Sequence, residues 1–575
     1  MKKTLFTIII LFVPILVFSQ EKNKKLTSFS DDAKLFVEEL DEFMNYSKNK
    51  NLRKVFSAFE DNLETEKFNS KSVKQIIDVS NSMLSKRLRP NPHFSEFLNA
   101  LNQFAYQSDA TPKFSNWINV VDSLLKESTT KRLILFFRFT ESFISSGVLR
   151  DSRTAKWICP SSDYTFEMEF GHPYLKFSKD FNLSCYASGS SFYIYKTKGK
   201  YWPLDFKWEG KGGIIDWQKV GFHKDSVYAI LANYKIDIKK AQFNADSVLF
   251  YNKHTFIRPF VGSVKHKIEV GGYDKKRSYP FFQSKGKDVV IAEVFPDVDY
   301  KGGYILKGKE FIADGGDYAE ARIILKRNEK PIIIANANRF NIEDDKISSQ
   351  LAAVKVFFDN DSIYHSALKF TYIDSKRKLE LYRAKNGVSE SPLINTYHQV
   401  TMDCELLEWN IDKDIIFFGS LPGTSISTAY FESTNNYSEA KYQRLHRMDK
   451  IHPLILIRNY VREKGEDLIF VEDFARYAKY PLTQIKHYLS DLSNKGFLYY
   501  DYGEQRIRIL PKLYNYVRAK SGKGDYDVIS FKSEVPGNTG AMQINSALNI
   551  TTKDLNILGV PEINISDSQR VYMYP

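Results

Sequence analysis

The chain has 575 residues, 43% of them hydrophobic, which is long and apolar enough for several domains with ordinary cores and excludes a disordered chain. Its formal net charge of +13 is spread thinly and favours only weak attraction to acidic partners. Three cysteines are too few for a disulfide-rich fold, and their spacing excludes a zinc site.

The first residues have the pattern of a secretory signal peptide. Lys2 and Lys3 precede an apolar run of about 14 residues, 5–18, and the small residue Ser19 comes before a charged segment. The run is shorter than the ~20 apolar residues that span a bilayer, and no later stretch of that length lacks charges. We therefore expect a cleaved leader over residues 1–20 and a mature chain in the periplasm or at the cell surface, without a transmembrane segment. An uncleaved N-terminal anchor is the alternative.

Residues 28–152 are predicted to form a helical domain. Apolar side chains recur there at intervals of three and four residues, which is typical of amphipathic helices that bury one face. Five or six such stripes are separated by short polar breaks, which favours a small helical domain or a helical-repeat array. Two of the stripes are formed by Leu35, Phe36, Leu40 and Phe43 and by Trp117, Val120, Val121 and Leu124.

Residues 155–440 are predicted to form one long all-β region. Short β-type runs, such as 191–195, alternate there with clusters of Gly, Asn and Asp. The phrase Asp-Ser followed by an aliphatic residue begins at Asp225, Asp246 and Asp361, where the polar pair suits a turn and the apolar residue would begin a strand. This recurrence favours a β-solenoid or a jelly roll, and a β-sandwich would also produce it.

Two of the three cysteines are candidates for a disulfide. Cys159 and Cys185 are 26 residues apart and flank a strand-rich segment, and an exported chain can form disulfides. The odd number of cysteines leaves at least one thiol, Cys404 in this pairing, without a partner in the chain.

Residues 446–518 change back to a helical pattern. The sequence predicts a helix over 452–461, a strand over 468–470, helices over 471–478 and 482–494, and a hairpin made by 497–500 and 506–510. This order resembles that of a winged-helix domain. Because β-type runs return over 525–575, the domain is predicted to be an insertion in a β-architecture. The strand-like last residues predict that the natural chain continues.

The third helix and the wing of this domain supply a candidate interaction surface. Gln484, Lys486 and His487 point outward from the helix, and Arg506 and Arg508 lie in the wing. In a cytoplasmic regulator such side chains would suit base and phosphate contacts, but an exported domain meets no chromosome. We therefore predict that these five residues dock partners, which are envelope proteins or anionic lipid or glycan, rather than DNA.

The motifs of common enzymes are missing. The sequence has no Gly-x-Ser-x-Gly elbow, no His-Glu-x-x-His and no phosphate-binding P-loop, and its histidines lack metal-ligand spacing. We therefore predict no catalytic residue, no cofactor and no metal site. Neighbouring carboxylates at turns suit solvated caps better than a glycosidase or calcium site; these are Asp297 and Asp299, Asp314 and Asp317, and Asp344 and Asp345.

Two segments are similar to the strand phrases of lipopolysaccharide-transport jelly rolls of the organic-solvent-tolerance type. They are Asn-Ala-Asp-Ser-Val at 244–248 and Glu-Ser-Thr-Asn-Asn-Tyr-Ser-Glu-Ala at 432–440. The resemblance implies stacked strands around an open groove for acyl chains. The leader ending in Ser19 and Gln20, with the strands rich in Tyr, Asn and Lys, resembles large exported envelope proteins of Bacteroidota-type bacteria.

Together these features predict a multidomain α+β protein: an N-terminal helical domain, a long solenoid or jelly-roll region, an inserted winged-helix-like domain, and β-structure that resumes at the C-terminus. The favoured function is a non-enzymatic envelope scaffold or binding protein whose helical modules dock partners. One alternative is a carrier that holds lipid, lipopolysaccharide or glycan in a β-groove, which a filled interior would exclude. The other is a glycan-active enzyme, which turnover dependent on one Asp or Glu would establish.

Overall fold

The computed structural model has 29% of its residues in helices and 43% in strands, and it divides into two compact units. The first unit comprises Met1–Gly213 with Lys235–Ala241, and the second comprises Ile214–Tyr234 with Gln242–Pro575. No helix of the described segments is long and apolar enough to cross a membrane. The structure describes residues 26–572 apart from 46–49, 107–109, 257, 269–277, 316–319, 384–390, 424–425, 447–450, 467, 502–504, 538–540 and 565–569. The predicted leader, residues 1–20, lies outside the described residues.

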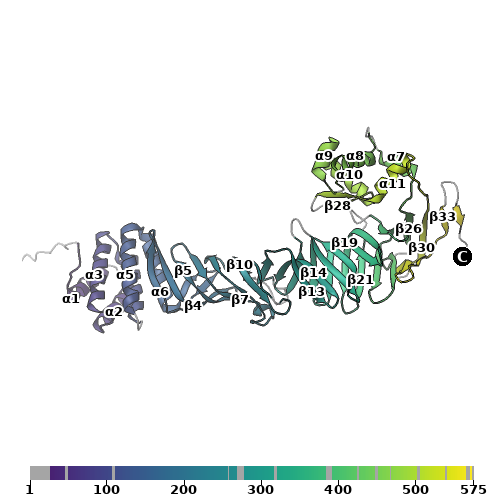
Figure 1. Cartoon of the computed structure of the whole chain (residues 1–575). Coiled ribbons are helices and arrows are strands. Elements are labelled where there is room, and N and C mark those ends of the chain that lie inside the picture. The colour runs from purple at the N-terminus through teal and green to yellow at the C-terminus, as the bar shows by residue number, and fades with distance from the viewer. Residues whose placement is uncertain are drawn as a thin grey trace, which may run out of the picture. The chain divides into compact units, whose positions relative to one another are not determined.

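The predicted N-terminal helical region is confirmed (Figure 1). Phe36, Leu40 and Trp117 are fully buried, whereas Leu35, which was predicted to share the face of Phe36 and Leu40, is 51% exposed. The Asn69 side chain accepts a hydrogen bond from the Ser72 amide and so caps the third helix. The helices are α1 (Ala33–Asn45), α2 (Lys50–Glu64), α3 (Ser70–Ser85), α4 (Ser95–Ala105), α5 (Ala110–Glu127) and α6 (Thr130–Ser146).

The helices of the first unit pack directly on its strands. Phe166 of β3 contacts the rings of Phe104 and Phe136, at centroid distances of 6.3 and 6.0 Å, and Phe143 contacts Tyr164 at 4.9 Å. Helices and strands therefore share one aromatic core. The strands, which pair antiparallel, are β1 (Val148–Asp151), β2 (Lys156–Ile158), β3 (Thr165–Glu169), β4 (His172–Ala187), β5 (Ser190–Trp202) and β6 (Lys207–Lys211).

The three cysteines are buried free thiols. The register of β2 and β4 sets Cys185 opposite Trp157, so Cys159 is its diagonal neighbour. Diagonal positions are about 7–8 Å apart, and disulfides usually join Cα atoms within ~7 Å. The Cys159–Cys185 bridge stays a prediction, and this register makes it depend on a shift of the backbone.

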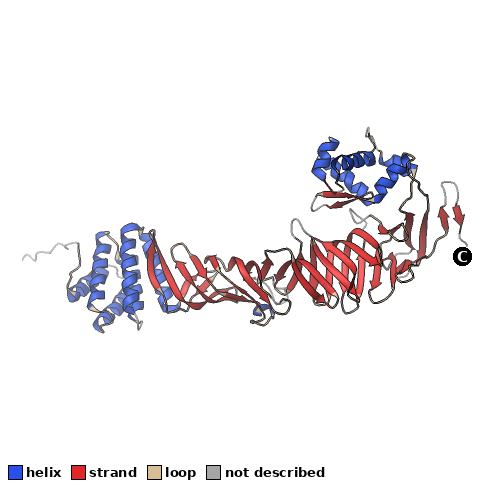
Figure 2. Ribbon diagram, in the orientation of Figure 1, coloured by secondary structure: helices blue, strands red, loops and turns tan. Residues whose placement is uncertain are grey.

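The second unit consists mainly of antiparallel strands, which confirms that the predicted β-region is rich in strands (Figure 2). Its strands before the helical segment are β7 (Ile214–Asp216), β8 (Val227–Ile230), β10 (Gln242–Asn252), β11 (Phe260–Lys267), β12 (Phe281–Ser284), β13 (Val289–Phe295), β14 (Val298–Lys307), β15 (Glu310–Asp314), β16 (Ala321–Arg327), β17 (Lys330–Ala337), β18 (Arg339–Glu343), β19 (Lys346–Phe358), β20 (Asp361–Ile373), β21 (Lys378–Tyr382), β22 (Leu393–Asn395), β23 (Val400–Asp403), β24 (Leu406–Asn410), β25 (Ile415–Ser420) and β26 (Ile426–Ser433). The division between the units crosses β9 (Asn233–Asp237).

Two ladders of strands share the long strands β14, β19 and β20. One half of each long strand belongs to the ladder β14–β16–β17–β19–β20–β22–β23–β26, and the other half belongs to β14–β15–β18–β19–β20–β21–β24–β25. Many inward-facing side chains of both ladders are at most 1% exposed, among them Val354, Phe370, Ile416 and Phe418. The interior between the ladders is therefore filled by side chains.

The recurring Asp-Ser phrase has two different structural settings. Asp225 and Ser226 precede β8, and Asp361 begins β20, so these copies lie at strand starts as predicted. The copy at Asp246 instead lies inside β10, where Ser247 has a φ of 57° and the pairing with β11 shifts register. The same local sequence thus forms a bulge there rather than a turn, because both flanking segments continue the ladder.

A helical module interrupts the strands. We define the module as residues 439–520, which contain helices α7 (Glu439–Leu445), α8 (Pro453–Lys464), α9 (Val471–Ala478), α10 (Leu482–Asn494) and α11 (Pro511–Lys520), and a three-stranded sheet of β27 (Leu468–Phe470), β28 (Leu498–Asp501) and β29 (Arg506–Ile509). The strands then resume with β30 (Ser530–Pro536), β31 (Gln543–Asn549), β32 (Leu555–Ile557), β33 (Glu562–Asn564) and β34 (Arg570–Tyr572). Because β26 and β30 pair antiparallel, the module begins and ends at neighbouring strands.

Candidate binding pocket and docking surface

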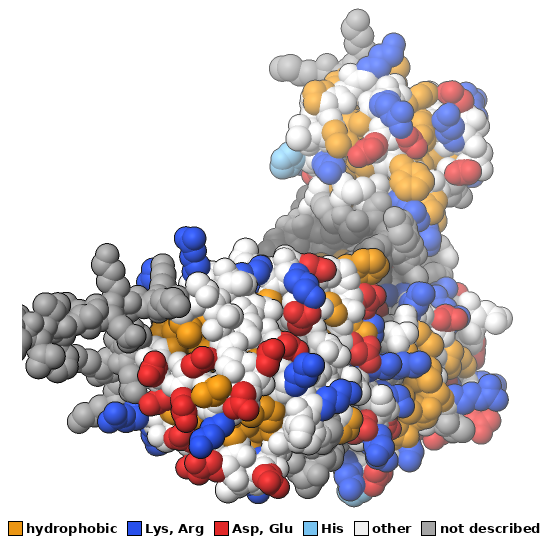
Figure 3. Space-filling model, turned by 90° about the vertical axis from the view of Figure 1, so that its left-hand side faces the viewer, with side chains coloured by type: hydrophobic (Ala, Val, Ile, Leu, Met, Phe, Trp, Pro, Cys, Tyr) orange, Lys and Arg blue, Asp and Glu red, His pale blue; other side chains and the backbone are white. Residues whose placement is uncertain are grey.

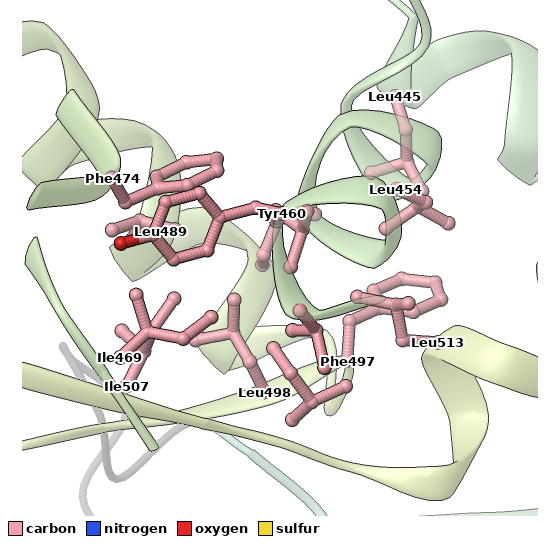
Figure 4. Packing of buried hydrophobic residues seen from close by; sticks show 14 of the residues in the cluster. Leu445, Leu454, Tyr460, Ile469, Phe474, Leu489, Phe497, Leu498, Ile507 and Leu513 are labelled. Carbon is pink, nitrogen blue, oxygen red and sulfur yellow. The ribbon is translucent and has the colours of Figure 1, made fainter. Parts of the chain in front are cut away.

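The helical module has a hydrophobic core of its own (Figure 4). Leu489 from α10 and Phe474 from α9 lie over Ile469 and Ile507 of the small sheet, and all four side chains are at most 3% exposed. Their spacing along the chain follows the helical and strand periods, so the amphipathic pattern alone produces this core. Gly465, with a φ of 73°, ends α8 in a conformation that favours glycine.

The predicted docking residues of α10 lie on its outer side. Gln484 and His487 are exposed and Lys486 is partly exposed, while Ile485 and Leu489 point into the core. On the face of the module that Figure 3 shows, at the upper right, basic, acidic and hydrophobic side chains are interspersed. That face therefore presents no continuous basic patch.

The predicted docking residues of the wing lie on a different side of the module. Ile507 and Ile509 point into the core, so Arg506 and Arg508 occupy the opposite face of β29. The Arg506 guanidinium lies over the ring of Phe470, 4.6 Å from its centroid. The structure therefore brings Arg506 and Arg508 together, but it does not bring them onto the surface formed by Gln484, Lys486 and His487.

A larger feature that the sequence did not reveal is a pocket of about 780 Å³ at the base of the module. We call it the module pocket. Its floor is one face of the strands β23, β26, β30 and β33, and its walls are α7, the end of α10, and α11. The strand register gives the floor two rows of side chains, Asp403, Tyr430, Lys532 and Glu562 in one row and Thr401, Glu432 and Ser530 in the other.

One carboxylate connects the floor of the module pocket with two of its walls. Glu432 of β26 lies 2.5 Å from the Lys441 Nζ of α7 and 3.5 Å from the Lys512 Nζ of α11. The side chains of Glu432 and Lys512 are only 18% and 14% exposed. Burial raises the pKa of Glu432, but the charges and hydrogen bonds of the two lysines outweigh burial and hold that pKa below its usual range. Burial also lowers the pKa of Lys512, against the opposing charge of Glu432.

The remaining cations of the module pocket differ in their partners. Lys495 pairs with Asp491 at 2.6 Å, and Lys532 pairs with Glu534. Arg444 of α7 donates its Nε–H to the backbone oxygen of Ala440 and has no carboxylate at ion-pair distance among the described residues. All four charged side chains of the helical walls are cationic, namely Lys441, Arg444, Lys495 and Lys512.

Tyr430 presents an exposed aromatic face to the module pocket. Its side chain is 52% exposed, and the Lys532 Nζ lies 5.9 Å from the centre of its ring. On the other face of the same strands, Phe431 and Phe531 stack at 5.4 Å. Phe431 is fully buried and Phe531 is partly buried, and their contact joins the strands that carry Tyr430 and Glu432 at the edge of the pocket.

Two smaller cavities occur in the described part of the second unit. One, of about 410 Å³, lies beside Tyr460 and Phe470, and the other, of about 330 Å³, is lined by Tyr499 and by polar residues of β17 to β20 such as Asn336. Neither contains a buried ion pair, whereas the module pocket combines volume, charge and an exposed ring. The module pocket is therefore the stronger candidate site.

The neighbouring carboxylates of the sequence mostly form ion pairs. Asp297 contacts Arg377 at 3.0 Å, Asp299 contacts Lys326, and Asp314 contacts Lys287. Asp345 accepts hydrogen bonds from Ser375, and Asp317 lies outside the described residues. In the described ranges, no three or more His, Cys, Asp or Glu side chains converge in a way that could hold a metal ion.

We compared the chain with known protein families, curated proteins and solved structures. The chain matches no family model, no curated protein and no solved structure.

Proposed function

We propose that the protein is an exported, non-enzymatic scaffold or binding protein of the cell envelope, in which the helical module docks partners. The observation that carries this proposal is the insertion of a separately cored module between the paired strands β26 and β30. A module that begins and ends at adjacent strands has a defined base, and the ion pairs of Glu432 stabilise that base. Envelope proteins and anionic lipid or glycan are the partners that this arrangement suits.

The element order supports the winged-helix-like assignment of the module. Helix α8, strand β27, helices α9 and α10 and the hairpin of β28 and β29 follow one another in the order of that domain class. DNA binding is the weaker proposal, because Arg506 and Arg508 lie apart from the outward residues of α10. A DNA reader needs its helix and wing contacts to follow one duplex.

The filled interior favours the scaffold over the lipid carrier. A groove for acyl chains needs apolar side chains that face open space, whereas the inward side chains of β19, β20 and β25 are nearly unexposed. A solenoid or jelly-roll body is therefore proposed as a support for the module rather than as a lipid container. The glycan-active enzyme is disfavoured because the candidate carboxylates Asp297, Asp299 and Asp314 are paired with cations.

Export and docking are tested in the same experiment. The full chain is produced with its leader in the cell that makes it, with a photo-reactive amino acid at Gln484 or His487 on α10 and, as the matched control, at the exposed Lys369 of β20. We expect a mature N-terminus near residue 21, recovery in the envelope fraction, and cross-links from α10 only. A cytosolic full-length product, or equal cross-linking from Lys369, would contradict the proposal.

A further inference from the structure

The two sides of the module pocket differ in chemistry. The helical walls contribute only cationic side chains to its charge, while the floor contributes carboxylates, the Lys532 ammonium paired with Glu534, hydroxyl groups and the exposed ring of Tyr430. A volume of about 780 Å³ is within the usual range of small-ligand sites. A ligand that matches both sides therefore needs an anionic group on one side and a polar, hydrogen-bonding ring on the other.

The charge balance of the pocket favours a single negative charge on the ligand. Lys441 and Lys512 share the one carboxylate of Glu432, and Arg444 pairs with no carboxylate of the described residues. Asp403 on the floor is neutralised by its ion pair with Arg383, whereas the carboxylate of Glu562 would repel a dianion more strongly than a monoanion. The planar guanidinium of Arg444 can bind a carboxylate through two parallel hydrogen bonds.

The floor favours a ring with several hydroxyl groups. Thr401 and Ser530 flank Glu432. The Thr401 hydroxyl donates to the backbone oxygen of Glu432 and keeps only its accepting lone pairs, whereas the Ser530 hydroxyl can donate and accept. The Asp403 carboxylate pairs with Arg383 but is 47% exposed, so its other lone pairs can accept hydrogen bonds from ligand hydroxyls, which an acyl chain cannot donate. The exposed face of Tyr430 provides an apolar surface for the C–H side of a sugar ring.

From these observations we infer that the module pocket binds a sugar acid, namely a uronic acid unit of an acidic glycan, with its carboxylate at Arg444 and its ring over Tyr430. This inference rests on the proposed binding role of the module and specifies its ligand. An anionic lipid would satisfy the cationic walls, but its acyl chains would donate no hydrogen bond to the accepting oxygens of the floor.

The test is isothermal titration of the mature chain with trisaccharides of galacturonate, glucuronate and mannuronate. Each acid is compared with its methyl ester, which has the same ring without the charge, and with inorganic phosphate and phosphatidylglycerol vesicles. We expect at least one acid to bind and its ester to bind about tenfold or more weakly, because a hydrogen bond to a charged group accounts for roughly that factor or more.

Variants locate the site. Arg444→Gln should weaken binding of the acid by about ten- to a hundredfold, Arg444→Lys by less, and Tyr430→Ala should weaken acid and ester alike. Arg462→Gln, at an exposed arginine on α8, is the matched control and should change the Kd less than about twofold. Both arginines are exposed, so neither change should affect folding.

Three results would overturn the inference: no binding of any acid, equal binding of acid and ester, or equal effects of Arg444→Gln and Arg462→Gln. Binding of phosphate or lipid vesicles without binding of the sugar acids would overturn it in favour of a phosphorylated ligand. Each of these results leaves export and α10 cross-linking unaffected, so failure of the ligand assignment is distinct from failure of the proposed function.

Discussion

The attachment of the module to its supporting strands should depend on the carboxylate of Glu432. In Glu432→Gln the side chain keeps its size, but the Lys512 Nζ, in a side chain that is 14% exposed, loses the carboxylate 3.5 Å away. Removing one partner of a fully buried ion pair costs about 3–5 kcal/mol, and an exposed pair contributes at most ~1 kcal/mol. Because both side chains retain some exposure, we expect a loss of about 2 kcal/mol.

The substitution Lys512→Met removes the other partner of the same ion pair and should have a smaller effect on stability. That substitution removes the buried cation and leaves Glu432 paired with Lys441 at 2.5 Å, so no buried charge remains without a partner. We therefore expect Lys512→Met to cost less than Glu432→Gln. Glu463→Gln, at an exposed carboxylate of α8, is the matched control and should change stability by less than about 0.5 kcal/mol.

Hydrogen exchange followed by mass spectrometry measures the effect locally, which matters in a chain that does not unfold as one unit. A loss of about 2 kcal/mol corresponds to roughly 30-fold faster exchange of α7 and α11 amides, while β19 and β20 should exchange as in the unmodified chain. The reasoning is refuted if Glu432→Gln exchanges like Glu463→Gln, or if Lys512→Met is the more damaging change.

Three further results are expected. The pKa of Glu432 is held below its usual range, so the stability that its carboxylate provides is present above the ordinary pKa of a glutamate and is lost as pH falls through the lower folded pKa. Amide exchange in α7 should therefore accelerate below about pH 4 and not between pH 6 and 8. Burial raises the pKa of Cys159, Cys185 and Cys404 to about 12. Ellman's reagent should therefore modify no thiol in the native chain and three thiols after denaturation without reductant. Modification of only one thiol after denaturation would instead reveal the Cys159–Cys185 bridge. Phe474→Ala should destabilise the module by about 3–5 kcal/mol, seen as rapid exchange of α9 and α10, because it empties a site that is 1% exposed; exchange unchanged from the unmodified chain would show that this core does not stabilise the module.

The sequence predicted the local elements of the module well. The observed bounds of α9, α10 and β27 coincide with the predicted ranges 471–478, 482–494 and 468–470. Each of these segments buries one face, and the spacing of its own apolar residues determines that face. Helix α11 was not predicted, although Pro511 begins it and Leu513, Tyr516 and Val517 form its buried face.

The predicted docking surface shows where local patterns stop being sufficient. Gln484, His487 and Arg508 were grouped because each points away from an apolar stripe. However, the helix and the sheet cover opposite sides of the core. The apolar pattern of each element shows only which of its own residues point away from the core. Which outward residues share a surface depends on the packing of α10 against β29, and that packing joins segments that are not adjacent in the sequence.

The pocket could not be inferred from spacing, because its floor combines four strands that are far apart in the chain. Glu432 and Lys512 are separated by 80 residues, and Tyr430 faces Lys532 across the whole insertion. One signal was nevertheless present. If an insertion leaves and re-enters one sheet, the strands before and after it are neighbours. Burial of Phe431, against which Phe531 stacks, then sets which side chains of both strands share a face. Glu432 and Ser530 must then point to the other face, at the base of the inserted module. The sequence alone can therefore predict that an acidic residue of β26 faces the cationic base of the inserted module.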